Sequence, residues 1–385
     1  MKALAMTTIG FLGNPARLNP GSKDNTGNIV HGHAARSIFR KPQPLSKLDD
    51  PETAARARQT YSHLAFVAAT MLHVNKVPGY IESHARMADF LEKTGLPVVT
   101  FGFGCQAALG QSLADAEVDS RSVRLLRVIA DLSQSIAVRG AYTADLCRKY
   151  GVTNVELIGC QSAYVAGIAN WGRLPKAPTR PKAPVGHVSF GPDERHVLNL
   201  MMQAGCDIIG QGNPLEQAIA AQALSAADLV SGNHAFGTWP TVRKLIGTDP
   251  DKARAYHAFI RERFHTFYDV DSWQSHFKNN DFAFGTRFHG NMIALQAGVP
   301  ALWLVHDMRT QELCNHLSLP QIPHGAVGPR ICIEDLAAAT DYSAFKAAFP
   351  ANLARFMAYL DRNGVTHMLR PEFVQAAQGI TEAAA

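Results

Sequence analysis

Residues Asp281-Phe-Ala-Phe-Gly-Thr-Arg-Phe-His-Gly-Asn-Met-Ile-Ala-Leu-Gln-Ala-Gly-Val-Pro300 predict a strand, a charged turn and a helix in succession. Phe282 to Gly285 is a short apolar run of the kind that forms a buried strand. Beyond the turn, apolar side chains recur at helical spacing, at Phe288, Met292, Leu295 and Val299. The hydrophobic period changes at Thr286 and Arg287, so we expect a helix to begin where the charge lies.

The start of this helix has the chemistry of an anion site. Thr286 is placed to cap the first amides, whose unpaired N–H groups and dipole attract negative charge. Arg287 can add bidentate hydrogen bonds to a carboxylate or phosphate, and His289 offers a proton donor at the same point. Gly290 is small enough to let the helix lie close to a sheet or a ligand. The sequence therefore predicts an anion-binding site with an acid beside it.

Arg139 occupies a second turn of the same type. Ser135 to Arg139 predicts a short strand that ends on the arginine, and a helix follows as far as Tyr150. In an open parallel sheet, such turns lie at the carboxyl edge, where ligands bind. Elsewhere an arginine is more often a surface salt-bridge partner, so it is this position that favours a binding role for Arg139.

Three further turn residues, Asn28, Asp307 and Arg309, are candidates for ligand contact. Asn28 stands at the start of a helix that runs to Phe39, where it can present its amide to a ligand or belong to a plain capping turn. Asp307 and Arg309 follow a predicted strand from Ala301 to Val305. They can touch a ligand from the same sheet edge, or cap and pair on the next helix, and the cap is the favoured alternative.

Strands and helices alternate through both halves of the chain, which predicts an α/β fold built from βαβ units. Trp171 to Pro184 interrupts this alternation with four prolines and several basic residues, as interdomain linkers do. We expect an N-terminal domain over residues 1–172 and a Pro/Lys-rich linker over 173–186. A C-terminal domain should follow over 187–330, and helices over 331–385 should pack across both domains.

Composition and charge limit the classes of partner. The chain has 385 residues, 46% hydrophobic and 18% charged, which is ordinary for a globular protein with a large core. Its net charge of +5 is scattered and forms no basic patch, so we expect small anions rather than nucleic acid as ligands. The longest apolar stretches, 64–72 and 292–305, are too short or too broken to cross a bilayer. A cytoplasmic protein with at most peripheral membrane contact is therefore expected.

Metals and redox cofactors are not expected. The six cysteines are far apart and form no CxxC motif, as is typical of buried thiols in a reducing compartment. Of the 16 histidines, His31 and His33 form the close pair, and no HExxH or carboxylate cluster accompanies them. The turn Gly102 to Ala107 has alanine in the third glycine position, and the next strand ends on Arg139 rather than an acid, which argues against a nicotinamide cofactor.

Four features together resemble the polysaccharide pyruvyl transferase family. They are Thr286-Arg-Phe-His-Gly-Asn291, Ala297-Gly-Val-Pro300, the upstream pair Val138-Arg139, and the lead-in from Trp273 to Asp281. The likeness spans most of the chain, from about Asp24 to Leu319. It implies two Rossmann-like domains whose parallel sheets face each other across a cleft, similar to GT-B glycosyltransferases.

The resemblance also implies a donor substrate. In that family an Arg-hydrophobic-His triplet and an earlier arginine are associated with binding phosphoenolpyruvate, and they map onto Arg287, Phe288, His289 and Arg139. The C-terminal domain would then be the donor side, and the N-terminal domain would be the acceptor side that contributes Arg139. Departures from the family pattern occur at residues 65–73 and 159–162.

The implied reaction suits these charges. Transfer of a pyruvyl group as a ketal begins with protonation of the methylene carbon of phosphoenolpyruvate, and a sugar hydroxyl captures the resulting cation before phosphate leaves. His289 would supply the proton, while Arg287, Arg139 and the helix amides neutralise the substrate anions. A second hydroxyl of the same sugar would close the ring. Candidates for the base that accepts the hydroxyl proton are Asp24, Asp307 and Glu312.

The leading hypothesis is a cytoplasmic transferase of exopolysaccharide biosynthesis that moves pyruvate from phosphoenolpyruvate, its co-substrate, to a saccharide. Lipid-linked and nucleotide-linked acceptors are both open, and no cofactor is expected. The alternative enzyme is a glycosyltransferase of the same architecture, in which the C-terminal helix start binds a nucleotide-sugar. A third hypothesis is a non-catalytic anion or glycan sensor that keeps the pocket without turnover.

Overall fold

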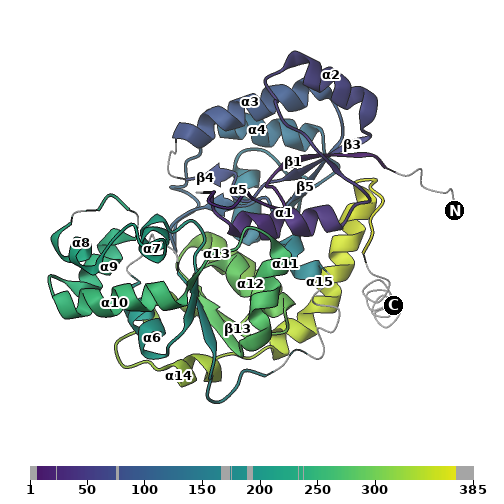
Figure 1. Ribbon diagram of the computed structural model, residues 1–385. Coiled ribbons are helices and arrows are strands. Elements are labelled where there is room, and N and C mark those ends of the chain that lie inside the picture. The colour runs from purple at the N-terminus through teal and green to yellow at the C-terminus, as the bar shows by residue number, and fades with distance from the viewer. Residues whose placement is uncertain are drawn as a thin grey trace.

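The structure is a computed structural model that describes residues 7–22, 24–74, 78–165, 174, 176–188, 194–232, 234–236 and 238–369. Two lobes of strands and helices lie next to each other, and the long helix α15 (Ser343–Arg362) runs along the flank of both (Figure 1). Parts of two predicted segments lie outside the described residues, namely 171–173 and 175 of the linker region and 370–385 at the C-terminal end.

The first sheet has the strand order of flavodoxin-like folds. Its first four strands pair in parallel in the order β2, β1, β3, β5, over Gln43–Pro44, Ile9–Gly13, His63–Val67 and Val98–Phe101. A parallel bridge from Phe103 to Val138 continues this order into β7 (Ile136–Val138), which pairs with β8 (Val155–Leu157). A separate parallel pair is formed by β4 (Leu72–His73) and β6 (Cys105–Gln106). Without that pair, the order counted along the chain is 2-1-3-4-5-6, which reverses direction between β1 and β3.

Helices cover both faces of this sheet, because successive strand residues point to opposite sides. Phe11 and Ala65 point to the face that carries α1, whereas Leu12, Leu64 and Phe66 point to the opposite face. In Figure 1, α2, α3 and α4 lie on that opposite face. The helices of this lobe are α1 (Gly27–Ser37), α2 (Pro51–Thr60), α3 (Pro78–Thr94), α4 (Ser120–Asp131) and α5 (Ala141–Lys149), followed by the 3₁₀ turn η1 (Gln161–Tyr164).

The second sheet has six parallel strands in the order β11-β10-β9-β12-β13-β14. Counted along the chain, this is the Rossmann order 3-2-1-4-5-6, which reverses between β9 and β12. The strands are β9 (Pro184–His187), β10 (Asp207–Ile209), β11 (Phe264–His265), β12 (Phe282–Gly285), β13 (Ala301–Val305) and β14 (Gln321–Pro323). Their helices are α6 (Arg195–Gln203), α7 (Pro214–Ala220), α8 (Ala226–Ser231), α9 (Trp239–Ile246), α10 (Pro250–Arg263), α11 (Val270–His276), α12 (Phe288–Gln296), α13 (Met308–Leu317) and α14 (Ile333–Ala338), with 3₁₀ turns at Phe277–Asn279 and His324–Ala326.

The predicted fold class is therefore confirmed, since both lobes are α/β, parallel and wound in Rossmann-like orders. The strands β12 and β13 have the predicted bounds, because both apolar runs are completely buried. Gly285 ends β12, and Pro300 directly precedes β13. No helix within the described residues combines the length and the apolar character needed to span a bilayer.

Helix α15 connects the two sheets through buried tyrosine hydroxyls. Just before the helix, Tyr342 Oη accepts a hydrogen bond from Ala301 N and donates one to Ala301 O, both at 2.8 Å. Near its end, Tyr359 Oη accepts from Thr100 N at 2.9 Å and donates to Thr100 O at 2.8 Å. One helix thus satisfies backbone groups of β13 in the second lobe and of β5 in the first, which fixes the lobes relative to each other.

Replacing Tyr359 with phenylalanine should lower the free energy of unfolding by about 1–3 kcal/mol, because two backbone groups of Thr100 would be left buried without that partner. Urea denaturation of the purified variant measures the loss. The matched control is Tyr61→Phe in the same lobe, a half-buried tyrosine for which a change within about 0.5 kcal/mol is expected. Equal losses in both variants would contradict the linking role of Tyr359.

Candidate functional site

The carboxyl ends of the first sheet open into a cavity of about 340 Å³ between the lobes. The first lobe contributes the segments after β1 and β3, including Gly13, Asn14 and Val67, so the cavity lies where the strand order reverses. The second lobe contributes His289 of α12 and Arg309 of α13. The predicted cleft between the two sheets is therefore present.

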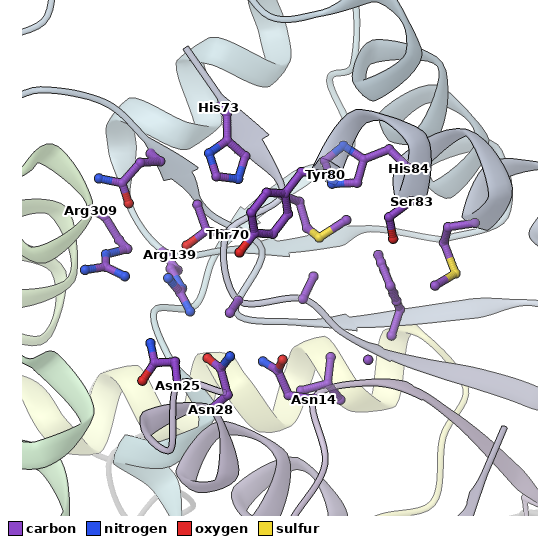
Figure 2. A pocket seen from close by; sticks show the side chains of 18 of the residues that line it. Asn14, Asn25, Asn28, Thr70, His73, Tyr80, Ser83, His84, Arg139 and Arg309 are labelled. Carbon is purple, nitrogen blue, oxygen red and sulfur yellow. The ribbon is translucent and has the colours of Figure 1, made fainter. Parts of the chain in front are cut away.

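Four predicted site residues line this cavity, namely Asn28, Arg139, His289 and Arg309. Figure 2 shows the guanidinium groups of Arg139 and Arg309 near each other at one end, with Asn28 on an adjacent wall. Five other predicted residues are not among those that line it, namely Thr286, Arg287, Phe288, Gly290 and Asp307. The structure thus brings together arginines from both lobes at one cavity. Of the predicted motif that starts at Thr286, only His289 lines this cavity.

Arg139 is a buried cation with unused donors. Its side chain follows β7, is 1% exposed, and packs so closely on Gly104 that a Cβ there would lie 2.5 Å from Arg139 Cδ. Within the described residues, its Nε and Nη2 have no hydrogen-bond partner. Burial, followed by the charge of Arg309, lowers the pKa of Arg139 to about 10, so it is still a cation at neutral pH. Buried guanidinium donors of this kind favour a bound anion.

His289 lies on α12 against a second buried histidine. Its Nε2 is 3.5 Å from Cys160 Sγ, and its ring centroid is 5.5 Å from that of His31. Burial, followed by the charges of Arg139 and Arg309, places the pKa of His289 well below its usual value. The imidazole is therefore neutral in the free protein at neutral pH. Burial is also the main cause that lowers the pKa of His31 well below its usual value. Its Nδ1 lies 3.2 Å from Asn14 Nδ2.

The predicted cap on α12 is wrong. The helix begins at Phe288 with Arg287 in the N-cap position, and the side chain of Arg287 makes no cap hydrogen bond. Thr286 is buried, and its N–H donates to His187 O at 2.9 Å. That bond closes the last pair of β12 with β9, Gly285 with His187, so the Thr286 N–H is tied to the end of the sheet and the helix starts two residues later.

The neighbours of Thr286 are held by the second lobe. Arg287 Nε donates to Val188 O at 3.1 Å, and burial, followed by the charge of Arg309, lowers the pKa of Arg287 to about 10. Phe288 is buried with its ring 5.9 Å from Trp303, which makes it a core residue. At Gly290 a Cβ would lie 2.6 Å from His187 Nδ1, so the small residue serves the packing of α12 on β9.

Asp307 is the N-cap of α13, in agreement with the favoured alternative. Its carboxylate accepts from Thr310 N at 2.8 Å and from Gln106 Nε2 at 3.0 Å, and it forms an ion pair with Arg309 Nη2 at 3.3 Å. Burial alone would raise the pKa of Asp307, but the charges of Arg309 and His306 and these hydrogen bonds hold it well below its usual range. Asp307 thus orients Arg309, which is the residue that reaches the cavity.

None of the three predicted bases lines the cavity. Asp307 is occupied as described, and Glu312 accepts from Thr143 N at 2.9 Å and from Thr143 Oγ1 at 2.6 Å. Asp24 is exposed and accepts from Ser22 Oγ at 3.0 Å. These carboxylates organise helix ends and loops because short acidic side chains favour such positions.

Other cavity residues were not identified from the sequence. The wall across from the arginines carries His73, Tyr80, Ser83 and His84 from β4 and α3 (Figure 2). Tyr80 is 52% exposed, and its ring centroid lies 4.7 Å from that of His73. In the sequence, the feature that could have indicated this wall was Tyr80, an aromatic residue near the start of a helix. The other residues of the wall could not be linked to it, because folding brings them together from separate segments.

The fold and the cavity define a two-lobed α/β protein with a cationic cleft. Residues 218–308 match the family model described as polysaccharide pyruvyl transferase, a family of transferases. The matched segment includes Arg287, His289 and Asp307 and ends beside Arg309. The family resemblance predicted from the motif at Thr286 is therefore confirmed for this segment.

Comparison with curated proteins gives no match. Solved structures similar to this chain include Anabaena HepE in complex with UDP and glucose, at 12% identity and a TM-score of 0.43 over 98% of this chain and 99% of that one. S. aureus MnaA with UDP is similar at 10% identity and a TM-score of 0.39, over 93% and 98% of the two chains. The wall teichoic acid polymerase TagF is similar at 11% identity and a TM-score of 0.38, over 98% and 90%.

The buried neutral state of His289 predicts a change in the pH dependence of stability. An imidazole that is neutral when folded takes up a proton on unfolding below about pH 6.5, so the free energy of unfolding must fall as the pH falls. His289→Asn removes one such proton, so its stability should fall less steeply between about pH 7 and pH 5, by up to about 1.4 kcal/mol per pH unit. Urea denaturation of both proteins across this range measures the two slopes. Parallel slopes would show that His289 is not held neutral by the fold.

Proposed function

We propose that this chain transfers the pyruvyl group of phosphoenolpyruvate to a saccharide as a ketal, with release of phosphate. The observation that supports this best is the meeting of Arg139 and His289, from opposite lobes, with Arg309 at one cavity. The family match that includes His289 supports the same class of reaction. Saccharides linked to lipid or to nucleotide are both compatible acceptors, and such a product belongs to polysaccharide biosynthesis.

The donor is a small, strongly anionic molecule, and the cationic end of the cavity suits it. Arg139 offers Nε and Nη2, and Arg309 offers Nε, all three without a hydrogen-bond partner within the described residues. A carboxylate and a phosphate can each accept from a guanidinium, and both gain from burial because water competes less. Arg287 adds positive potential behind this wall, since burial and then the charge of Arg309 lower the pKa of Arg287 only to about 10 and leave it a cation at neutral pH. We assign the phosphate and carboxylate of the donor to Arg139 and Arg309.

The acid of the proposed reaction is His289, which must first gain a proton. Arg139 and Arg309 disfavour its charged form in the free protein, and a bound anion beside them reverses that effect. Proton uptake would therefore accompany donor binding. The imidazolium then gives its proton to the methylene carbon, and a sugar hydroxyl oxygen bonds to the adjacent cationic carbon. Phosphate leaves with cleavage of its C–O bond, and a second hydroxyl closes the ketal ring as its proton passes to the departing phosphate.

The base in this proposal is His73 rather than an acidic residue. It lines the cavity on the wall opposite the arginines, and its Nε2 has no hydrogen-bond partner within the described residues. Burial lowers the pKa of His73 below its usual value, so its imidazole is neutral and can accept a proton from a sugar hydroxyl. The tilted ring of Tyr80, with its centroid 4.7 Å from that of His73, packs against the imidazole, and aromatic surfaces of this kind also suit the apolar faces of sugars.

His289→Asn should reduce the turnover number for phosphate release from phosphoenolpyruvate by about 10²-fold or more, because it removes the acid. Arg139→Gln should mainly raise the KM for phosphoenolpyruvate, since it removes charge that binds the donor. A coupled phosphate assay with a panel of sugar acceptors measures both. The control is His257→Asn, a second-lobe histidine whose ring bonds Leu224 O and does not line the cavity, and it should retain activity.

Thermal unfolding in the presence of each ligand, combined with the phosphate assay, separates the competing functions. Stabilisation against heat by a nucleotide-sugar, but not by phosphoenolpyruvate, would select a glycosyltransferase and reject the proposal. Donor binding without product from any acceptor would select a non-catalytic sensor.

Donor binding at about pH 7.5 should take up close to one proton, because the bound anion raises the pKa of His289 from its depressed value. Calorimetric titration of phosphoenolpyruvate in two buffers of different ionisation enthalpy gives the number of protons. The uptake should disappear in His289→Asn and persist in His257→Asn. Uptake that is unchanged in His289→Asn would assign the proton to another group and remove His289 from the role of acid.

A further inference from the structure

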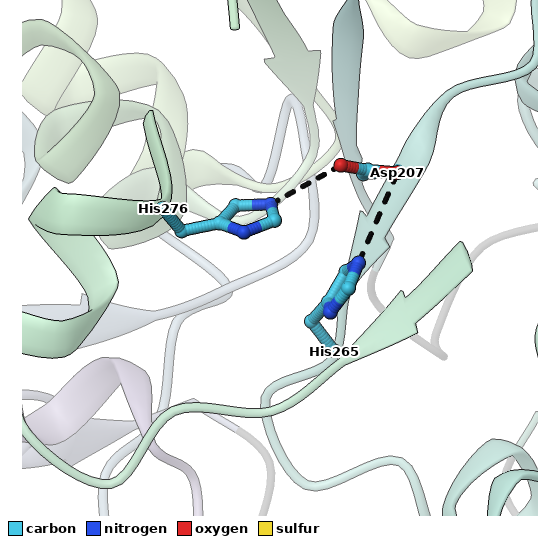
Figure 3. Close-up of side chains that lie close together, drawn as sticks. All are labelled: Asp207, His265 and His276. Carbon is cyan, nitrogen blue, oxygen red and sulfur yellow. Dashed lines mark ion pairs between the residues drawn. The ribbon is translucent and has the colours of Figure 1, made fainter. Parts of the chain in front are cut away.

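A second group of chemically active side chains lies in the second lobe, away from the cavity. Asp207 at the start of β10, His265 on β11 and His276 at the end of α11 place one ligand atom each within 4.8 Å of one another (Figure 3). None of the three lines the cavity described above. Their sequence separations match no metal-binding motif, so the fold alone assembles them.

We propose that Asp207, His265 and His276 form a binding site for a divalent transition-metal ion, with Zn²⁺ the ion that fits this ligand set best. Two imidazoles and a carboxylate are a typical three-ligand zinc set, and the fourth position of the tetrahedron remains for water. Oxygen-seeking ions such as Mg²⁺ and Ca²⁺ prefer sets without imidazole. The inference is independent of the proposed pyruvyl transfer, since it concerns different residues and a different ligand.

The distances fit such an ion without rearrangement of the backbone. His276 Nε2 lies 3.3 Å from Asp207 Oδ2, and His265 Nε2 lies 3.8 Å from Asp207 Oδ1. Ligand atoms at about 2.0–2.2 Å from a tetrahedral ion are about 3.3–3.6 Å apart, so the three side chains, whose ligand atoms lie within 4.8 Å of one another, would have to rotate inward to bind it. Among the described residues, His276 Nε2 is buried and has no hydrogen-bond partner of good geometry, as expected of an atom that serves as a metal ligand.

The surroundings hold the two imidazoles and leave access from solvent. Their ring centroids are 4.5 Å apart, and Phe267 packs 5.2 Å from His276. The side chains of Asp207, His265 and His276 are 20%, 35% and 18% exposed, which permits an ion to enter. One feature opposes binding, because Arg263 Nη1 lies 3.6 Å from Asp207 Oδ1. Arg263 also pairs with Glu262 at 3.1 Å and is 43% exposed, so it has another partner when an ion takes the carboxylate.

A bound ion would brace the outer edge of the second sheet. The edge strand β11 has two residues, and its parallel pairing with β10 is correspondingly short. An ion at this cluster would join β10, β11 and α11, and α11 packs against α12, which carries His289. By linking these three elements, the ion would stabilise the lobe that carries His289 and Arg309, while its fourth position stays open to water.

The test uses the full chain, freed of any affinity tag and stripped with a chelator, then dialysed against micromolar Zn²⁺. Elemental analysis should find one zinc per chain, and Zn²⁺ should raise the melting temperature by several degrees, because a ligand that binds the folded state stabilises it. Co²⁺ in its place should give the intense visible bands of a four-coordinate ion.

Variants locate the ion. Loss of an outer-sphere partner typically weakens metal binding by about 10- to 100-fold. His276→Asn and His265→Asn each remove a direct ligand, so each should weaken zinc binding by at least as much. His196→Asn on α6 of the same lobe is the matched control and should bind like the parent. Arg263→Gln removes the opposing charge and keeps every ligand, so it should tighten binding by roughly tenfold. Circular dichroism of each stripped variant shows whether it is folded.

The proposal is overturned if the parent binds no zinc at micromolar concentration. It is equally overturned if the folded variants His276→Asn and His265→Asn bind zinc as tightly as the parent. It is also overturned if Arg263→Gln binds zinc with the same affinity as the parent.

Discussion

The buried guanidinium of Arg139 is the constraint on which the arrangement of both lobes depends. A cation removed from water needs a partner, yet within the described residues two of its nitrogens have none. The nearest acidic side chains are committed elsewhere, Asp307 to Thr310 and Arg309, and Glu312 to Thr143. The unmet charge is therefore directed at the cavity, where an anion can neutralise it.

The opposite lobe completes this environment. His289 and Arg309 reach the cavity from the starts of α12 and α13, which follow the adjacent strands β12 and β13. Because parallel strands end at one edge, their following turns come to the same place. Helix α15 holds the second sheet against the first through Tyr342, at the amino end of β13, and Tyr359, so the distance between Arg139 and His289 is set by the packing of the whole chain.

The charge of the lining side chains differs between parts of the cavity. Cations gather at one end, whereas the wall formed by β4 and α3 carries neutral polar and aromatic groups such as Tyr80 and His73 (Figure 2). This division suits an anionic donor beside a neutral hydroxyl acceptor, since each would meet a wall of matching chemistry. His289 is neutral in the free protein because burial and then the neighbouring charges of Arg139 and Arg309 lower its pKa.

The sequence by itself determined the α/β class, the bounds of strands such as β12, and the presence of arginines at strand-to-helix turns. These features depend on local periodicity, which acts within a few residues and is visible in one dimension. It also indicated the family of the segment around Arg287, but it placed Thr286 as a cap, whereas the N-cap is Arg287 and the Thr286 N–H bonds to the neighbouring strand.

Only the tertiary structure decided that Arg309 rather than Arg287 reaches the cavity, that His73 and Tyr80 face the arginines, and that Asp207, His265 and His276 meet. Each outcome depends on how side chains from segments far apart in sequence pack together. Burial and electrostatic effects act through space, so no pattern along the chain carries them.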